Sequence, residues 1–136
     1  MRVFVTGATG HIGSALVPEL ISAGHKVTAL ARSDASAATA ERLGAEIRRG
    51  DLEDLDVLRD AAREADGVIH LAFREDAMRS GDFEGAIASD LAAIQAFGEA
   101  LEGTGKAFVG ASVMLTLAGR GRAATEEDTN PYRFSD

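Results

Sequence analysis

Short apolar segments alternate with segments of helical periodicity along almost the whole chain. Apolar residues at steps of three and four are typical of one buried helix face, whereas short continuous apolar runs are typical of strands buried on both faces. The sequence predicts strands at 3–5, 26–31, 46–49, 68–72 and 106–110, of which we expect the first, fourth and fifth to be buried on both faces. The predicted helices run from Ile12 to a stop near Gly24, with Pro18 accommodated inside, and over 34–43, 55–65 and 83–101.

Strands that alternate with helices connect by right-handed crossovers and form a parallel sheet with helices on both faces. We therefore predict an α/β protein with a three-layer, doubly wound parallel sheet of about five strands. The pattern covers residues 1–115, which we interpret as one domain, and it gives way to an irregular segment at 116–136. We expect the chain to be truncated, with a catalytic and substrate-binding part beyond residue 136.

Composition and charge narrow the classes of partner. The 136 residues carry a formal net charge of −8, which repels phosphate backbones at long range, so we expect no nucleic-acid partner. The chain has no cysteine and therefore no disulfide or thiolate metal site. No apolar run approaches the roughly 20 residues that span a bilayer. We expect no targeting segment, no membrane association and a cytoplasmic location.

Three glycines follow the first predicted strand and open the first predicted helix. Gly7 permits a tight turn, Gly10 lets backbone amides approach a pyrophosphate, and Gly13 lets the helix pack closely on the strand. The free N–H groups and the positive dipole end of that helix favour a bound diphosphate. Glycine turns also occur as purely structural features, but this position at the start of an alternating chain is typical of an NAD(P)-binding Rossmann domain.

The motif Thr6-Gly7-x-x-Gly10-x-x-Gly13 resembles the fingerprint of the short-chain dehydrogenase/reductase superfamily, in the extended or atypical branch that includes NAD-dependent epimerases, dehydratases and related reductases. Three further motifs occur in the family's order: Gly50-Asp51-Leu52 resembles its adenine-contacting pair, His70-Leu71-Ala72 its cofactor-lining segment, and Ala111-Ser112 the site of its serine. The resemblance implies hydride transfer between C4 of a nicotinamide and a small-molecule carbonyl or alcohol substrate. The cofactor-binding residues that it implies are Gly7, Thr9, Gly10, His11, Ile12, Gly13, Asp51, Leu52, Leu71, Ala72, Phe73 and Ala111.

The residues after the second strand bear on the choice between NADP and NAD. An NAD enzyme usually has an acidic residue there to bind the ribose hydroxyls, whereas this sequence has Ala31-Arg32-Ser33-Asp34. Arg32 can hold a 2′-phosphate by charge-assisted hydrogen bonds, with Ser33 adding a donor. In the alternative interpretation, Arg32 is a solvated surface residue and Asp34 caps the next helix. We favour NADP over NAD.

The family's catalytic residues are only partly present. The resemblance assigns to Ser112 the polarisation of the substrate oxygen, beside a tyrosine acid/base and a lysine that lowers the tyrosine pKa; alternatively, Ser112 merely ends a buried strand. The only tyrosine, Tyr132, is followed four residues later by Asp136, so the Tyr-x-x-x-Lys pattern is absent and we interpret Tyr132 as a loop residue. Either the pair lies beyond residue 136, or the protein is a non-catalytic NADP-binding module, for instance a redox sensor. The abrupt end of the pattern favours the first explanation, and Asp90, where extended members usually have asparagine, favours the second.

The remaining titratable residues predict no metal site. His11, His25 and His70 are too scattered for a shared metal, and we expect each to pack in the core or lie on the surface. An uncovered sheet edge after the fifth strand makes homo-oligomerisation a further expectation. A solvated loop is predicted for the charged residues near the C-terminal end, Arg120, Arg122, Glu126, Glu127 and Asp128.

Overall fold

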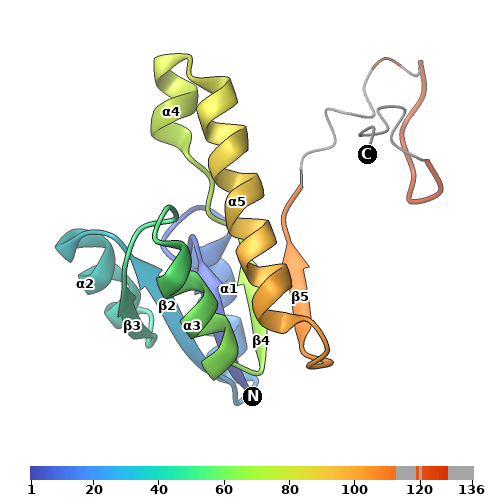
Figure 1. Ribbon diagram of the computed structural model, residues 1–136. Helices are drawn as coiled ribbons and strands as arrows, with labels where there is room; N and C mark the ends of the chain where they lie inside the picture. Colours follow the sequence, from blue (N-terminus) through green and yellow to red (C-terminus); the bar gives the residue numbers. More distant parts are fainter. Residues whose placement is uncertain (113–118, 120, 129–136) are drawn as a thin grey trace.

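The computed structural model describes residues 1–112, 119 and 121–128. Strands and helices alternate in this part of the chain, and the carboxyl-terminal ends of the strands share one edge of the sheet (Figure 1). The strands are β1 (Arg2–Thr6), β2 (Lys26–Ala31), β3 (Glu46–Arg49), β4 (Gly67–His70) and β5 (Ala107–Gly110). The helices are α1 (Gly13–Ser22), α2 (Asp34–Arg42), α3 (Leu55–Glu64), α4 (Glu75–Ser80) and α5 (Phe83–Leu101).

All strand pairs are parallel, and their order is β3-β2-β1-β4-β5. Alternate residues of β1 face opposite layers: Phe4 packs with α3 and α5, whereas Val3 and Val5 pack with α1 and α2. The strand order reverses at β1: β2 and β3 are added on one side of β1, and β4 and β5 are then added on its other side. These features confirm the predicted doubly wound, three-layer sheet.

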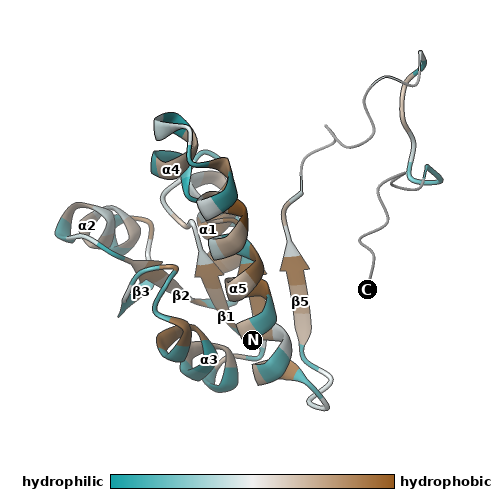
Figure 2. Ribbon diagram, turned by 45° about the horizontal axis from the view of Figure 1, so that its top comes forward, coloured by the Kyte–Doolittle hydropathy of each residue, from teal (hydrophilic) through white to brown (hydrophobic). Residues whose placement is uncertain are grey.

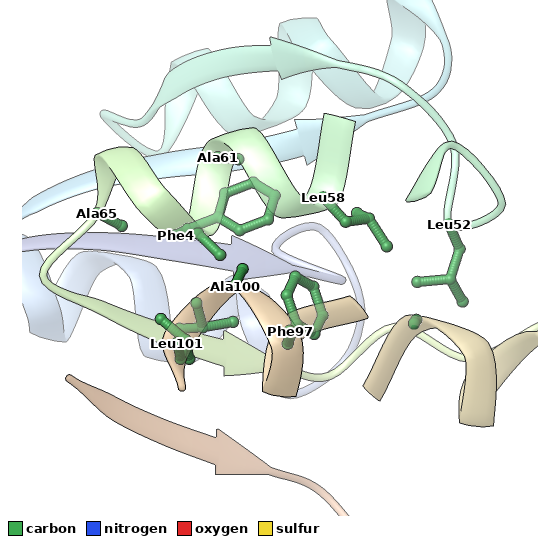
Figure 3. Close-up of a cluster of buried hydrophobic side chains, with 11 residues drawn as sticks. Phe4, Leu52, Leu58, Ala61, Ala65, Phe97, Ala100 and Leu101 are labelled. Atoms are coloured by element: carbon green, nitrogen blue, oxygen red, sulfur yellow. The ribbon is translucent and has the colours of Figure 1, made fainter. Parts of the chain in front are cut away.

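The core between the sheet, α3 and α5 is built around two phenylalanines (Figure 3). The rings of Phe4 and Phe97 meet edge to face with centroids 6.2 Å apart, and neither side chain is exposed to solvent. Leu58 and Leu101 pack beside them. Because the neighbouring positions on α3 and α5 are mostly alanine, these helices approach the sheet and each other closely.

Helix ends follow the turn chemistry of the sequence. After α1, Gly24 has a φ of +87° and donates its N–H to the Ile21 carbonyl, while His25 donates to the Leu20 carbonyl. This pair of hydrogen bonds is a Schellman motif, in which glycine is favoured because its φ is positive. Pro18 lies inside α1, which continues from Gly13 to Ser22, so the prediction that the helix survives the proline is confirmed.

Two expectations about the sheet and its connections are wrong. The strand predicted at 106–110 is β5, but it is exposed rather than buried on both faces: Val109 is 55% exposed. The reason is its place at the edge of the sheet, beside α5, where its apolar residues are visible in Figure 2. The strand predicted at 68–72 ends at His70, and the chain continues through a loop into α4, which periodicity did not predict.

No helix within the described residues is both long and apolar enough to cross a membrane. The boundary predicted at residue 115 falls in 113–118, outside the described residues, as do Arg120, Tyr132 and Asp136. Of the acidic loop residues, Asp128 forms an ion pair with Arg122.

Candidate functional site

A cavity of about 410 Å³ lies at the carboxyl-terminal edge of the sheet, where the strand order reverses between β1 and β4. In doubly wound sheets, ligands bind outside the carboxyl-terminal ends of the strands at such a reversal of the strand order. The cavity is lined by the turn after β1, the end of β2, and the loops after β3 and β4. Its lining residues are Gly7, Thr9, Gly10, His11, Ile12, Gly13, Leu30, Arg32, Ser36, Gly50, Asp51, Leu52, Leu71, Ala72, Phe73, Arg74, Glu75 and Asp76.

The turn after β1 requires glycine at its first position for two independent reasons. Gly7 has a φ of +71°, which L side chains rarely adopt. A Cβ atom at Gly7 would also lie 2.7 Å from the backbone nitrogen of Ala72, in the loop after β4. The turn closes with a 3.1 Å hydrogen bond from the Gly10 N–H to the Gly7 carbonyl. The predicted tight turn is confirmed, and it lies directly against the loop after β4.

Gly13 allows α1 to begin in contact with the same turn. A Cβ atom at Gly13 would meet the Gly7 carbonyl oxygen and would lie 2.6 Å from the carbonyl carbon of Ala8. Gly13 therefore packs against the backbone of the turn, rather than against the strand as the sequence had suggested. Helix α1 has no side-chain cap and no acidic residue in its first turn. The N–H groups of Ser14 and Ala15 donate to the carbonyls of Gly10 and Ile12, but no carboxylate of the first turn faces the positive dipole end of the helix, which favours an anion such as a diphosphate.

The loop after β3 brings the predicted Asp51-Leu52 pair to the cavity. The Asp51 N–H donates to the Asp54 carboxylate at 2.7 Å, which fixes the start of the loop. Leu52 is buried in the core and also lines the cavity, so it offers an apolar contact held rigidly from behind. Gly50, in the same loop, packs closely on α3, since a Cβ atom added at Gly50 would lie 2.9 Å from the Val57 side chain.

The loop after β4 carries an arginine that the sequence reasoning missed. Arg74 donates to the Glu53 carboxylate at 2.6 Å and makes two bonds of 3.0 Å to Asp76. The hydrogen bond from Arg74 lowers the pKa of Asp76 from its usual 3.8 to about 2. Arg74 thereby ties the loops after β3 and β4 together on one side of the cavity. Nothing in the local sequence signals this contact, since Glu53 and Arg74 are 21 positions apart.

The end of the cavity near β2 combines predicted and unpredicted residues. Arg32 is exposed and lines the cavity, and no ion-pair partner lies near it among the described residues. Ser33 does not line it: its side chain accepts the Ser36 N–H at 3.1 Å and so caps α2. The alternative interpretation, in which Asp34 caps this helix, is therefore wrong on that point. Ser36, which was not predicted, is a lining residue, and its hydroxyl donates to the Ser33 carbonyl at 3.0 Å.

The structure places Ala111 and Ser112 apart from the cavity. Both are exposed and follow β5, where the Ala111 N–H donates to the His70 carbonyl at 3.1 Å. Neither is among the residues that line the cavity. Of the histidines, His11 is exposed at the cavity and His25 lies on the surface, whereas His70 is buried and hydrogen-bonded. No group of three potential metal ligands occurs in the part of the chain that the structure describes.

Comparison with known proteins agrees with this geometry. Residues 3–133 match the model of the NAD dependent epimerase/dehydratase family, and the chain belongs to that family. It is 45% identical over 130 residues to an uncharacterized protein of Saccharomyces cerevisiae. The matched region is 94% of this chain and 42% of that protein. It is 41% identical over 71 residues, 52% of this chain and 22% of the relative, to a decarboxylating sterol-4-alpha-carboxylate 3-dehydrogenase of Dictyostelium discoideum.

Solved structures show the same fold. A UDP-glucose-4-epimerase from Stenotrophomonas maltophila, with bound NAD, superposes with a TM-score of 0.78 at 24% identity, over 96% of this chain and 42% of that chain. The complex of MoeE5 with UDP-glucose and NAD gives a TM-score of 0.73 at 29% identity over the same shares. The chain thus spans less than half the length of these relatives, and it matches a family that depends on nicotinamide dinucleotides.

Proposed function

We propose that this chain is the cofactor-binding part of an NADP-preferring oxidoreductase or epimerase of the extended short-chain dehydrogenase type. The observation that carries the proposal is the cradle at Gly7 and Gly13, where side chains are excluded and the uncapped start of α1 lies at the cavity. Such a cradle fits the diphosphate of a dinucleotide. Membership of the NAD dependent epimerase/dehydratase family supports the same function.

A bound nicotinamide dinucleotide would supply the hydride acceptor or donor. The residues of this chain would bind and orient it. The amides of the turn and of the start of α1 would hold the diphosphate, while Leu52 and Phe73 would offer apolar contacts and Asp51 a polar one at the adenine end. Ser112, which lies outside the cavity, would act on the substrate oxygen as the family resemblance implies.

The preference for NADP rests on the charges at the end of β2. Arg32 lines the cavity without an ion-pair partner among the described residues, and Ser36 lines it as well. Asp34, the acidic residue that would favour NAD, forms an ion pair with Arg49 and does not line the cavity. A guanidinium free to form charge-assisted hydrogen bonds fits a 2′-phosphate better than a pair of hydroxyls.

The substrate of the whole protein is proposed to be a small carbonyl or alcohol compound, handled in the cytoplasm without nucleic acid or membrane as partner. Self-association stays a prediction. The alternative, a non-catalytic NADP-binding module, is favoured by two features of the sequence: Asp136, not lysine, stands four residues after Tyr132, and Asp90 stands where extended members usually have asparagine.

Calorimetric titration of the full-length protein with NADP and NAD tests the binding site. We expect NADP to bind at least about tenfold more tightly, the factor that one good charge-assisted contact supplies. Equal affinities would contradict the NADP preference, and binding of neither dinucleotide would contradict the site itself. Oxidation of NADPH with a panel of carbonyl compounds then separates the enzyme from the non-catalytic module, which would bind the cofactor without turnover.

A further inference from the structure

Three polar side chains form a hydrogen-bonded chain that crosses the buried layer between the sheet and α5. Thr6 ends β1 and His70 ends β4, and these two residues are neighbours in the parallel register of the sheet. The Thr6 hydroxyl lies 2.7 Å from His70 Nδ1, and His70 Nε2 lies 3.1 Å from a carboxylate oxygen of Asp90 on α5. Thr6 is fully buried and His70 is 4% exposed.

The partners of the imidazole determine which nitrogen carries its proton. Because a carboxylate oxygen only accepts hydrogen bonds, Nε2 of His70 must donate to Asp90. In the neutral ring Nδ1 then accepts, and the Thr6 hydroxyl is its donor. With its hydrogen committed to His70, the Thr6 oxygen keeps both lone pairs for acceptance. It uses them for the N–H groups of Leu71 and Ala72, each at 3.2 Å.

These two amides belong to the wall of the cofactor cavity. Leu71 and Ala72 both line it, and the Ala72 nitrogen would lie 2.7 Å from a Cβ atom at Gly7 in the facing turn. The Leu71 N–H has a second acceptor in the Thr6 carbonyl, also at 3.2 Å. The Ala72 N–H depends more on the Thr6 hydroxyl, so the orientation of that hydroxyl fixes the spacing between the wall and the turn.

A direct chemical role for these residues is inconsistent with their surroundings. Neither Thr6 nor His70 lines the cavity. The His70 ring packs against Phe97 with centroids 5.4 Å apart and lies 6.4 Å from the Phe108 ring. An enclosed imidazole of this kind orients its neighbours and does not exchange protons with a bound substrate.

We propose that His70 and Asp90 are a positioning pair for the cofactor site. Asp90 fixes the tautomer of His70, and His70 in turn orients the Thr6 hydroxyl. That hydroxyl accepts the N–H groups of Leu71 and Ala72 and so fixes the position of this segment beside the cavity. The inference rests on the proposed dinucleotide site. It also gives α5 a part in cofactor binding, although Asp90 itself does not line the cavity.

Two measurements on the full-length protein test the pair. Nitrogen-15 NMR of the wild-type histidines should show His70 with a protonated Nε2 and an unprotonated Nδ1. Calorimetry with NADP should show an affinity loss of about tenfold for Asp90→Ala, the effect expected when a buried donor loses its acceptor. Asp90→Asn should keep the tautomer and stay within about twofold, because its side-chain oxygen still accepts from Nε2.

Ser89→Ala is the matched control, since Ser89 is adjacent on α5 and its buried hydroxyl has no hydrogen-bond partner among the residues that the structure describes. It should leave both the tautomer and the NADP affinity unchanged. A wild-type His70 protonated on Nδ1 would overturn the proposal, even if no variant folds. So would an Asp90→Ala protein that binds NADP as tightly as wild type. Wild-type protein that binds no dinucleotide would instead refute the proposed function, while the NMR signature would still report on the pair.

Discussion

The guanidinium of Arg49 lies 2.9 Å from the carboxylate of Asp34, in an ion pair that joins the end of β3 to the first turn of α2. Both side chains are exposed, so the pair contributes little to the free energy of folding. The ion pair matters for the charge of the cavity. Asp34 is bound to Arg49 and does not line the cavity, whereas Arg32, two positions earlier, does line it. The end of the cavity near β2 therefore presents a cation rather than a carboxylate.

Replacement of Arg32 should change the choice of cofactor. Arg32→Ala should weaken NADP binding by about tenfold to a hundredfold, the loss of a charge-assisted contact, and leave NAD binding within about twofold. Calorimetric titration with both cofactors measures the two affinities. Arg42→Ala is the control, because it removes an exposed arginine of α2 that does not line the cavity and whose guanidinium bonds to Thr39. A parallel loss of NADP and NAD affinity in Arg32→Ala would contradict the assigned role.

The contact between Gly7 and the loop after β4 should be visible in the free energy of unfolding. Gly7→Ala adds a methyl group 2.7 Å from the Ala72 nitrogen, at a residue whose φ is +71°. We expect a destabilisation of more than about 2 kcal/mol by chemical denaturation. Gly24→Ala is the matched control: its φ is +87°, but nothing lies within 4 Å of the added methyl. It should cost only the backbone penalty of about 1 kcal/mol. An equal loss of unfolding free energy in both variants would contradict this prediction, because it would mean that the loop at Ala72 shifts to accommodate the added methyl group at little energetic cost.

Stability in acid should depend on Asp76. Its pKa is lowered from 3.8 to about 2 by the Arg74 hydrogen bond, so the ionised form stabilises the folded state. That contribution is fully present above the usual aspartate pKa and is lost as the pH falls toward about 2. Asp76→Asn should therefore unfold with a shallower pH dependence than wild type across this window. Thermal unfolding at a series of pH values measures the difference.

The control for Asp76 is Glu75→Gln, which removes an exposed ion pair with Arg79 on the same helix. It should retain the wild-type slope. If Asp76→Asn and wild type lose stability in parallel through this window, the bond from Arg74 does not persist in solution.

Phe97 should be among the most costly residues to truncate. Its side chain is fully buried and packs against the rings of Phe4, His70 and Phe108. Phe97→Ala should destabilise the protein by about 3–5 kcal/mol, because it removes buried contacts and leaves a cavity. Urea denaturation measures the change. Ile94→Ala, on the same helix but 39% exposed, should cost far less. Comparable losses would mean that another part of the protein covers Ile94.

The sequence by itself determined the alternation of strands and helices, the glycine turn and most of the cavity lining. These features are local: periodicity marks the buried face of an element, and Gly7, Gly10 and Gly13 mark a turn by the conformations and close contacts that they permit. The Asp51-Leu52 and Leu71-Ala72 segments reach the cavity because parallel strands end at one edge, so their place follows from the order of elements.

Only the tertiary structure decided which distant side chains meet. Thr6 and His70 are 64 positions apart, and their contact depends on the register between β1 and β4. The bond from Arg74 to Glu53 depends on how two loops approach each other, and the exposure of β5 depends on what lies beside the edge of the sheet. No local pattern encodes such contacts, because they arise when separate elements pack together.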